Sequence, residues 1–433
     1  MSDTERISPS GAENIFGKIV IPTIGIVLAL VRIGVCASPA ESEPLQTPMY
    51  LAQDKGQRTP IFVDSSCSTQ HLIKALKEAE NPYQRRYAAQ LLSDRGAREA
   101  VPYLLDTLND PEEVAQKAAA EALAKLGDRS LFDRLIANTT ATNGRVRKYS
   151  AYVLGWLANK EDRTVVEVLE ALAGDEDENV RAEATYALYK IGSPTSKNIF
   201  IGGLNDHEPR VRNYSATALG SLKGTEAGRA LVIALHREKD EDVRRTIASA
   251  LGKVGSVDAT RALVDALAYE TESVKADIVV ALGEAKSPAA IQALIGLLSD
   301  PSGDIRSKAA IALLNAKDPS SVKALAAALN DRVASVRRPA SEALKIFGDS
   351  SVLNEMIDAL GNSDSTVADN MVEALIRIGD LDAVHGLINS LGNPNQAQSE
   401  RAIAVLEEIT RRPYGSDAQR WKQWYEENFK SSD

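Results

Sequence analysis

One sequence motif recurs eleven times between residues 84 and 406, and successive copies almost always begin 31 residues apart. Clear copies read VRAEATYALYKIG from Val180, VRNYSATALGSLKG from Val211 and VRRTIASALGKVG from Val243. Without exception, a leucine lies eight residues after the first residue of each copy. A fixed period of this length is typical of stacked supersecondary units, each of which buries its apolar face against its neighbours. The repeat therefore decides the expected fold before any other feature is considered.

Each copy has the pattern of an amphipathic helix. If its first residue is position 0, the apolar residues fall at positions 0, 4, 7, 8 and 11, which share one helix face at about 100° per residue. A second apolar segment precedes each copy, as at residues 289–298 and 321–329. Asp/Asn turns such as Asn330-Asp331 separate the two segments, and these residues are expected to stop one helix and cap the next. Each unit is therefore predicted to be a helical hairpin.

Stacking of such hairpins predicts an all-α fold. We expect an α-solenoid, a superhelix of about eleven two-helix repeats over residues 68–412, closed by an aromatic capping helix in residues 413–433. The aromatic residues of that last helix share one face: Trp421, Trp424, Tyr425 and Phe429. Covering the exposed apolar side of the last repeat is the favoured role for this face, and docking of a partner is the alternative.

Glycines at position 12 of six copies are expected to end their helices. Glycine adopts the left-handed conformation without steric cost, and that conformation closes many helices at their C-terminal end. The residues concerned are Gly96, Gly127, Gly192, Gly255, Gly348 and Gly379.

The amino-terminal 37 residues have the pattern of a signal peptide or membrane anchor. Residues 19–31 carry no charge, small residues follow, and Glu41 and Glu43 come next. An uncleaved span of residues 19–35 has the minimum length that crosses a bilayer. The protein is then membrane-anchored or exported, with membrane contact only through residues 19–36. A disordered extension of a cytoplasmic protein is the alternative. Residues 38–67, rich in proline and polar residues, are predicted to be a disordered linker.

Composition argues against several function classes. The net charge of −10 disfavours a general nucleic-acid-binding protein, which needs an electropositive face. The two cysteines, Cys36 and Cys67, do not form a disulfide framework. The sequence shows no nucleophile–base arrangement, phosphate-binding glycine loop or metal-ligand cluster. We therefore predict no catalytic residues, no metal and no cofactor.

Position 1 of most copies is basic. In a stacked array these side chains form a ladder, and they are expected to pair with the acidic turn residues of the same or the next repeat. An anion-binding stripe is the alternative interpretation. The predicted structural ladder consists of Arg85, Arg147, Arg181, Arg212, Arg244, Arg306 and Arg337.

Aromatic residues break the periodicity in the first five repeats. Positions 3, 6 and 10 lie on one side of the helix, flanking the core, and in later repeats they hold residues such as Thr246, Asp277 and Ile311. Tyr and Trp provide large, rigid contact areas with polar tips, as interface hot spots require. Packing between neighbouring helices is the alternative. The predicted partner-binding aromatic stripe consists of Tyr87, Tyr149, Tyr152, Trp156, Tyr186 and Tyr214.

The helical pair and the phrase V-R-x-x-A-x-x-A-L-G resemble the HEAT repeat, specifically the short bacterial kind found in phycobilisome lyases. Val211-Arg212 with Ala218-Leu219-Gly220 carries the resemblance closely. It covers residues 68–412 and implies the fold rather than the function, because the matching residues are packing residues. Deoxyhypusine hydroxylase, a HEAT-repeat enzyme with His-Glu iron ligands, is excluded because His207-Glu208 is the sequence's only such pair.

These observations favour a non-enzymatic scaffold that binds a peptide or helix of a partner protein on the inner surface of the solenoid. The alternative implied by the resemblance is a phycobilin lyase or a pigment-protein assembly chaperone. Its partner would be a phycobiliprotein or a bilin.

Overall fold

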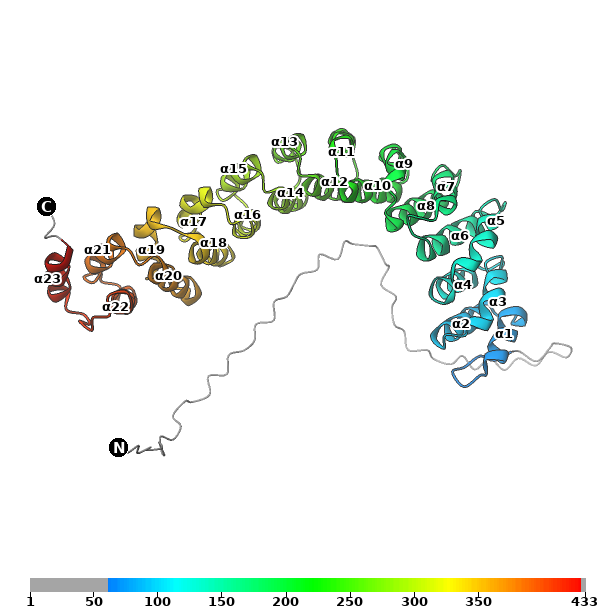
Figure 1. Cartoon of the computed structure of the whole chain (residues 1–433), viewed down its shortest axis with the longest axis horizontal. Helices are drawn as coiled ribbons and strands as arrows, with labels where there is room; N and C mark the ends of the chain where they lie inside the picture. Colours follow the sequence, from blue (N-terminus) through cyan, green and yellow to red (C-terminus); the bar gives the residue numbers. More distant parts are fainter. Residues whose placement is uncertain (1–60, 430–433) are drawn as a thin grey trace, which may run out of the picture. The chain divides into compact units, whose positions relative to one another are not determined.

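The structure, a computed structural model, describes residues 61–429. This part of the chain contains 23 α-helices and no β-strand. The first 22 helices form eleven consecutive hairpins, and Figure 1 shows the first helices of the hairpins in one row and the second helices in another. This arrangement confirms the predicted all-α solenoid. Across the described helices, none is both long enough and apolar enough to span a membrane. The predicted signal or anchor segment, residues 1–37, lies outside the described residues.

The second helix of each hairpin carries the repeated motif. These helices have nearly uniform length because the motif itself is uniform. Their bounds are α2 (Pro82–Asp94), α4 (Glu113–Leu126), α6 (Gly144–Leu157), α8 (Glu178–Ile191), α10 (Pro209–Leu222), α12 (Glu241–Val254), α14 (Glu272–Ala285), α16 (Gly303–Ala316), α18 (Ala334–Phe347), α20 (Ser365–Ile378) and α22 (Gln396–Thr410).

The first helices vary more in length, and five of them follow a single 3₁₀ turn. Their bounds are α1 (Thr69–Glu78), α3 (Val101–Thr107), α5 (Phe132–Asn138), α7 (Arg163–Leu172), α9 (Lys197–Gly203), α11 (Thr225–Arg237), α13 (Val257–Ala266), α15 (Pro288–Leu297), α17 (Val322–Ala328), α19 (Leu353–Ala359) and α21 (Leu381–Ser390). A last helix, α23 (Ala418–Phe429), follows the eleventh hairpin.

The turn residues follow the ends of the first helices, as predicted. The expectation that they cap the next helix is wrong, because they lie two residues before its N-cap. Asp331, for example, accepts a hydrogen bond from the backbone N–H of Val333, and Val333 is the N-cap of α18. Asp110, Asp206 and Asp300 do the same for the residue two positions later. The turn carboxylate therefore fixes the backbone just before the helix begins. It uses one oxygen for this hydrogen bond, and its second oxygen can bind another partner.

The position-12 glycines fall into two groups. Gly192 and Gly255, like Gly96 and Gly379, have φ between +56° and +70°, as expected for a left-handed helix end. Gly127 and Gly348 do not, and for them the prediction is wrong. A Cβ on Gly348 would lie 2.5 Å from both the Leu344 carbonyl oxygen and the Met356 side chain. Glycine is required at these two sites because neighbouring atoms approach closely, and not because of its backbone angle.

Consecutive second helices approach each other through glycine and alanine. In α12, a Cβ added to Gly252 at position 9 would lie 2.7 Å from the Cα of Ala281 at position 7 of α14. Gly155, Gly220 and Gly283 face the equivalent alanine of the following helix in the same way. Small residues thus allow the close stacking that the repeat needs, and the leucines at position 8 fill the core between the two rows.

We predict that Gly252→Ala destabilises the solenoid by about 1–3 kcal/mol, because the added methyl group forces α12 and α14 apart. The gain in helix propensity, at most about 1 kcal/mol, does not offset this cost. Gly296→Ala in α15 is the matched control, because nothing lies within 4 Å of its added Cβ and only the propensity gain applies. Urea unfolding followed by circular dichroism measures both changes. Equal midpoint shifts for the two variants would contradict the steric explanation.

Both ends of the array are covered. Residues 61–67, which the sequence analysis assigns to the linker, lie against the first repeat: Val63 is buried, and Arg95 donates to the backbone carbonyl of Ser65 at 2.7 Å. At the other end α23 packs on α21, where the His385 and Tyr425 rings stack with centroids 5.3 Å apart. Trp421 is completely buried. The terminal helix is therefore a cap, as predicted.

Candidate functional site

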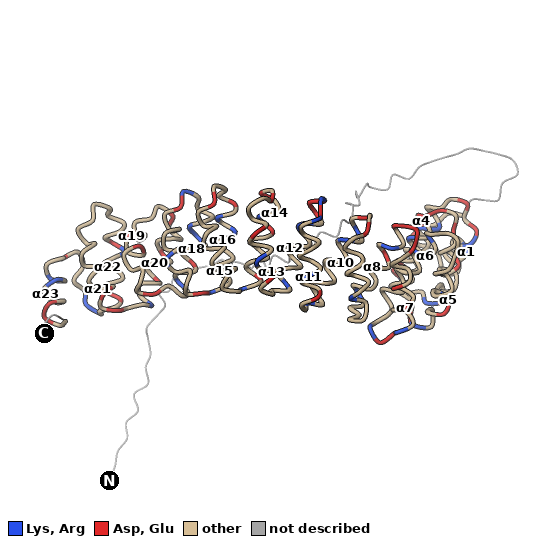
Figure 2. The backbone as a smooth tube through the Cα atoms, turned by 90° about the horizontal axis from the view of Figure 1, so that it is seen from above, with Lys and Arg blue, Asp and Glu red and all other residues tan. Residues whose placement is uncertain are grey.

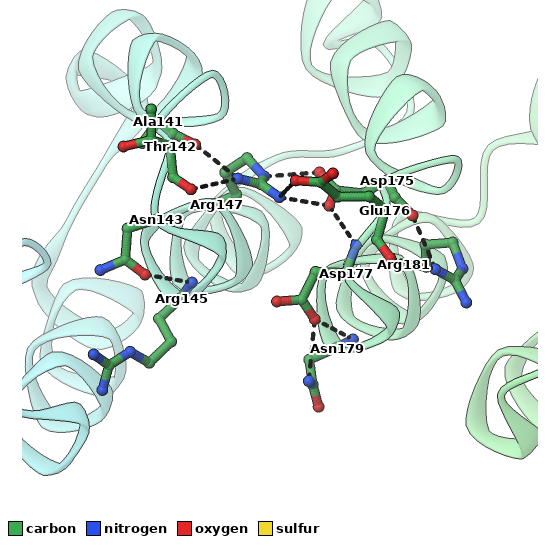
Figure 3. A network of polar contacts seen from close by, with 10 residues as sticks. All are labelled: Ala141, Thr142, Asn143, Arg145, Arg147, Asp175, Glu176, Asp177, Asn179 and Arg181. Atoms are coloured by element: carbon green, nitrogen blue, oxygen red, sulfur yellow. Dashed lines mark hydrogen bonds and ion pairs between the residues drawn. The ribbon is translucent and has the colours of Figure 1, made fainter.

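The position-1 arginines connect each turn to the next one. Arg147 shows the arrangement (Figure 3): its Nη1 donates to the carbonyl oxygens of Ala141 and Thr142 in its own turn, at 2.8 and 3.2 Å. Its Nε and Nη2 donate to the two carboxylate oxygens of Asp175 in the following turn, at 2.8 and 2.7 Å. Asp175 also accepts from the backbone N–H of Asp177. One guanidinium therefore holds two repeats in register.

Six of the seven predicted ladder residues pair with a carboxylate of the following turn. Five make the two-pronged contact, and Arg244 donates to Glu270 through its Nε at 3.0 Å. The side chains on both sides are mostly buried. The pairs are Arg85–Asp110, Arg147–Asp175, Arg181–Asp206, Arg212–Glu238, Arg244–Glu270 and Arg306–Asp331.

These contacts shift the pKa values of the paired carboxyl and guanidinium groups. Burial alone would raise the pKa of the Asp175 carboxyl, but the hydrogen bonds from Arg147 and from the Asp177 N–H outweigh burial and lower that pKa. For Asp331 the hydrogen bonds from Arg306 are the largest influence, and they also lower the pKa. The hydrogen bonds to Asp175 raise the pKa of Arg147. Both partners therefore stay charged, and the ladder is already neutralised within the protein.

Arg337 is the exception. Its Nη1 donates to the Asp331 carbonyl oxygen at 2.8 Å, but its buried Nε has no hydrogen-bond partner among the residues that the structure describes. The equivalent of the carboxylate in the other pairs is Asn362, 25 residues further on, just as Asp331 follows Arg306. The Asn362 side chain instead donates to the Leu329 carbonyl oxygen. An amide thus occupies the place of the missing carboxylate.

The predicted aromatic stripe divides into separate parts in the structure. Tyr149 is only 5% exposed and belongs to the core. Its hydroxyl donates to a carboxylate oxygen of Glu113 at 2.9 Å, and Lys148 donates to the same oxygen at 3.1 Å. Burial is the main cause that raises the pKa of Tyr149, followed by the hydrogen bond with Glu113. Tyr87 lies half-buried on α2, two repeats before Tyr149. Neither residue offers a large contact surface.

The other four aromatic residues lie on α6, α8 and α10 and remain accessible. Trp156 is 48% exposed, and its ring centroid lies 6.1 Å from that of Tyr152. The ammonium of Lys190, from α8, lies over the Trp156 ring. Tyr186 of α8 and Tyr214 of α10 have ring centroids 5.1 Å apart. The Tyr152–Trp156 pair forms within α6, whereas stacking of α8 on α10 brings Tyr186 and Tyr214 together.

A carboxylate lies among these rings. Glu183 is half-buried on α8 at position 3, between the repeats that carry Tyr149 and Tyr214 at the same position. No hydrogen bond or ion pair to it occurs within residues 61–429. Burial raises its pKa to about 7, although Lys148 and Arg210 act in the opposite direction. We refer to Tyr152, Trp156, Glu183, Tyr186, Lys190 and Tyr214 together as the aromatic site.

Because the pKa of Glu183 is raised from 4.5 to about 7, the folded protein holds this proton more tightly than the unfolded chain. Its contribution to stability therefore decreases as pH rises from about 4.5 to 7. We predict that Glu183→Gln increases the free energy of unfolding at pH 8 and that the increase shrinks toward pH 5. Urea unfolding at several pH values measures this difference. The groups that act on Glu183 or are acted on by it are retained in both proteins: Lys148, Tyr149, Tyr152, Tyr186 and Arg210.

Glu167→Gln, an exposed carboxylate on α7, is the control for that measurement. A Glu183→Gln difference that is independent of pH would contradict the burial of an ionisable carboxylate.

Two members of the aromatic site, Glu183 and Lys190, were missed by sequence reasoning. They occupy the same helix positions, 3 and 10, as the predicted aromatic residues. The predicted stripe was defined by its aromatic residues alone and therefore did not include the charged residues in the same columns. Reading all side chains at positions 3, 6 and 10 would have identified both.

Other surfaces of the described chain show different chemistry. Figure 2 shows acidic and basic residues interspersed along the solenoid rather than separated by sign. Surface hollows of about 670 and 350 Å³ lie on the row of first helices, at α7 and between α11 and α13. Among residues 61–429, no three His, Cys, Asp or Glu side chains are grouped to hold a metal ion.

Comparisons with known proteins support the architecture. A family model described as HEAT repeats matches residues 69–155, 132–212, 200–282 and 270–345, which together span more than half of the chain. No curated protein matches the sequence.

Solved structures that resemble the chain include Kap95p and importin beta. Kap95p in complex with RanGDP is 14% identical with a TM-score of 0.55, over 79% of this chain and 56% of Kap95p. Importin beta is 15% identical with a TM-score of 0.52, over 80% of this chain and 57% of importin beta. The chain thus spans little more than half the length of either. The CpcE–CpcF complex of phycocyanin lyase from a Nostoc species is 23% identical with a TM-score of 0.33, over 57% and 97% of the two chains.

Proposed function

Because the chain belongs to the HEAT-repeat family, we propose that it acts as a non-enzymatic scaffold that binds a partner protein on the exposed side of its second helices. The observation that carries this proposal is the aromatic site. Trp156 is 48% exposed and lies beside Tyr152, although large aromatic residues are otherwise rare in this sequence. Exposed Trp and Tyr on a rigid surface are typical of interface hot spots.

The stacking of the repeats supports this use of the surface. Each ring of the aromatic site extends from a helix whose opposite face is locked into the core by position-8 leucines such as Leu154 and Leu188. The side chains are therefore held on a rigid support before any partner arrives, which reduces the entropy lost on binding. Kap95p, which has this kind of fold, binds RanGDP. A peptide or helix of a partner protein is the ligand that such an extended surface fits best.

The proposal includes a location. Residues 19–31, apolar and uncharged, support anchoring in a membrane or export across it. The linker that follows would then hold the solenoid away from the bilayer. Fractionation of cells that make the full-length chain tests this part: recovery with membranes or outside the cytoplasm is expected. Recovery only in the soluble cytoplasmic fraction would contradict it.

Partner capture by the full-length chain tests the binding function. The double variant Trp156→Ala/Tyr186→Ala is expected to retain about a tenth or less of the captured partner, a loss of about 1.4 kcal/mol or more. Tyr269→Ala is the matched control, because Tyr269 is at least as exposed as Trp156 but follows α13 in the other row. Quantitative mass spectrometry of the captured proteins measures both. Unchanged capture by the double variant would contradict the site.

The same capture experiment distinguishes the alternative function. A lyase or pigment-protein chaperone is expected to bind a free linear tetrapyrrole, which is visible as a change in its absorption spectrum. Such binding, lost in the double variant, would replace the scaffold proposal. Capture of a partner protein without pigment binding supports the scaffold.

A further inference from the structure

Among residues 61–429, Glu183 has no counter-ion of its own. The two cations that act on it are engaged elsewhere: Lys148 donates to Glu113 at 3.1 Å, and Arg210 donates to Asn179 at 3.0 Å and pairs with Glu208. A carboxylate that is half-buried without a partner is costly, which is why its pKa rises. The aromatic site therefore contains an acidic group whose charge is not neutralised by an ion pair within the described part of the chain.

The same site already accommodates a cation on an aromatic face. The Lys190 ammonium lies over the Trp156 ring, and burial lowers the pKa of Lys190 to about 8. An aromatic ring attracts a cation through the negative potential of its face, and Trp does so best. Lys190 thus shows that an ammonium group fits on this ring. Because the pKa of Lys190 is nevertheless lowered, the contact with the ring compensates only part of the hydration that its ammonium group loses.

Negative potential extends across the rings between these two groups. Burial raises the pKa of Tyr152 to about 12, and the charges of Glu121 and Glu183 add to the increase. Burial and then Glu183 also raise the pKa of Tyr186. Two carboxylates and the faces of several aromatic rings therefore act on the same short stretch of α6 and α8.

From this arrangement we infer that the aromatic site recognises a positively charged side chain of the partner protein, a Lys or Arg flanked by apolar residues. The inference rests on the proposed scaffold function and specifies the chemistry of its partner. The incoming cation pairs with Glu183 and lies against the Tyr186–Tyr214 rings, while the apolar neighbours cover Trp156. Because Lys190 already lies over Trp156 and carries the same charge as the incoming side chain, it competes with the partner and moves from the ring into solvent on binding.

Tryptophan signals allow this recognition to be measured on the full-length chain. The protein has three tryptophans, and Trp156 is the one in the aromatic site, since Trp421 and Trp424 lie in the cap. After ¹⁵N labelling of the indoles, Trp156→Phe identifies the Trp156 resonance. The probe is a capped pentapeptide of alternating Lys and Leu. Its controls are the same peptide with Glu, or with uncharged norleucine, in place of Lys.

We expect the Lys peptide to shift the Trp156 indole resonance, and to do so less at high salt. Glu183→Gln, which keeps the shape of the side chain, is expected to weaken this binding about tenfold, since a charged hydrogen bond contributes about 1.5 kcal/mol or more. Glu167→Gln is expected to change nothing. Lys190→Gln is expected to strengthen the binding because it removes the competing cation.

Three outcomes would overturn the inference: no shift with the Lys peptide at millimolar concentration, equal binding of the Glu or norleucine peptide, or unchanged binding by Glu183→Gln. Each is separable from failure of the scaffold function. If Trp156→Ala/Tyr186→Ala loses partner capture while Glu183→Gln binds the Lys peptide as well as the native protein does, the surface binds a partner but not through a cation. If the double variant also keeps its captured partner, the scaffold site itself is wrong.

Discussion

Asp331→Asn is expected to lower the free energy of unfolding by about 3 kcal/mol, because it leaves the buried charge of Arg306 without a counter-ion. Arg306 is 6% exposed, and its Nε and Nη2 donate to the two Asp331 oxygens at 2.6 and 2.9 Å. Asparagine still accepts from the Val333 N–H, so the entry to α18 is retained while the charge is lost. The value is at the lower end for buried pairs because water screens charges in a two-layer fold more than in a thick core.

Hydrogen exchange of α16 and α18, together with urea unfolding, measures this loss, since solenoid repeats unfold partly independently. Asp106→Asn is the matched control. Asp106 pairs with Arg134 at 2.9 Å, but the two side chains are 69% and 58% exposed, so less than about 1 kcal/mol is expected. Similar losses in both variants would show that burial of the ladder is unimportant.

In the ninth repeat a carboxylate can be added instead of removed. Asn362→Asp would place a carboxylate opposite Arg337, whose Nε is buried without a partner. The cost of burying the guanidinium is already incurred, so the new pair is expected to raise the free energy of unfolding by about 1–2 kcal/mol. A decrease would mean that the Asn362 hydrogen bond to the Leu329 carbonyl oxygen is worth more than the missing ion pair.

The sign of the pH dependence follows from the same contacts. The hydrogen bonds from Arg306 lower the pKa of Asp331 below its ordinary value of 3.8. The stability that this pair contributes is therefore complete above about pH 4 and is lost as pH falls through the lower, folded-state pKa. Below that pH the difference between native protein and Asp331→Asn is expected to shrink, which an acid titration of both proteins measures.

Trp421→Ala is expected to have an effect of similar size, about 3–5 kcal/mol, confined to the carboxy-terminal end. Trp421 is completely buried, its Nε1 donates to the Gly415 carbonyl oxygen at 2.9 Å, and its ring contacts those of Tyr414 and Trp424. Without it α23 separates from α21 and uncovers the apolar side of the last repeat. Faster hydrogen exchange in α21–α23 and concentration-dependent association in size-exclusion chromatography are the expected signs.

Two further variants separate the causes. Trp421→Phe keeps most of the ring volume and loses the hydrogen bond, so it is expected to cost less than Trp421→Ala. Phe429→Ala removes an aromatic residue of the same helix that is 38% exposed, and it is expected to cost less than about 1 kcal/mol. An equal loss for Phe429→Ala and Trp421→Ala would contradict the capping role of the tryptophan.

Much of the fold was predictable from the sequence because each apolar position recurs in eleven copies, which makes its pattern unambiguous. Leu188 or Leu219 alone says little, but eleven leucines at one helix position identify a buried column, and all eleven are buried. The turn residues were harder. Aspartate is a residue type typical of N-caps, yet Asp331 lies two residues before the N-cap of α18 and binds Arg306. Sequence pattern identifies such residues but not the position at which the chain turns.

The candidate site shows a different limit. Tyr149 at position 3 and Trp156 at position 10 belong to the same predicted stripe, yet Tyr149 is 5% and Trp156 48% exposed. Contacts with neighbouring helices accompany this difference: the Tyr149 hydroxyl donates to Glu113 of the preceding second helix, α4, whereas Trp156 lies under Lys190 of the following one, α8. For the same reason the pairing of Tyr186 with Tyr214, and the position of Lys190 over Trp156, depend on the register between neighbouring helices.

The sequence by itself determined the repeat, the helical hairpin, the packing columns and the need for a cap, because these depend on periodicity within one or two helices. Tertiary structure alone decided which carboxylate each arginine binds, why Gly348 must be glycine, which aromatic rings remain accessible and that Glu183 has no counter-ion within residues 61–429. These properties depend on distances between side chains of neighbouring repeats. Such distances are set when helices stack, through contacts between residues some 25–35 positions apart, as in the pairing of Arg306 with Asp331.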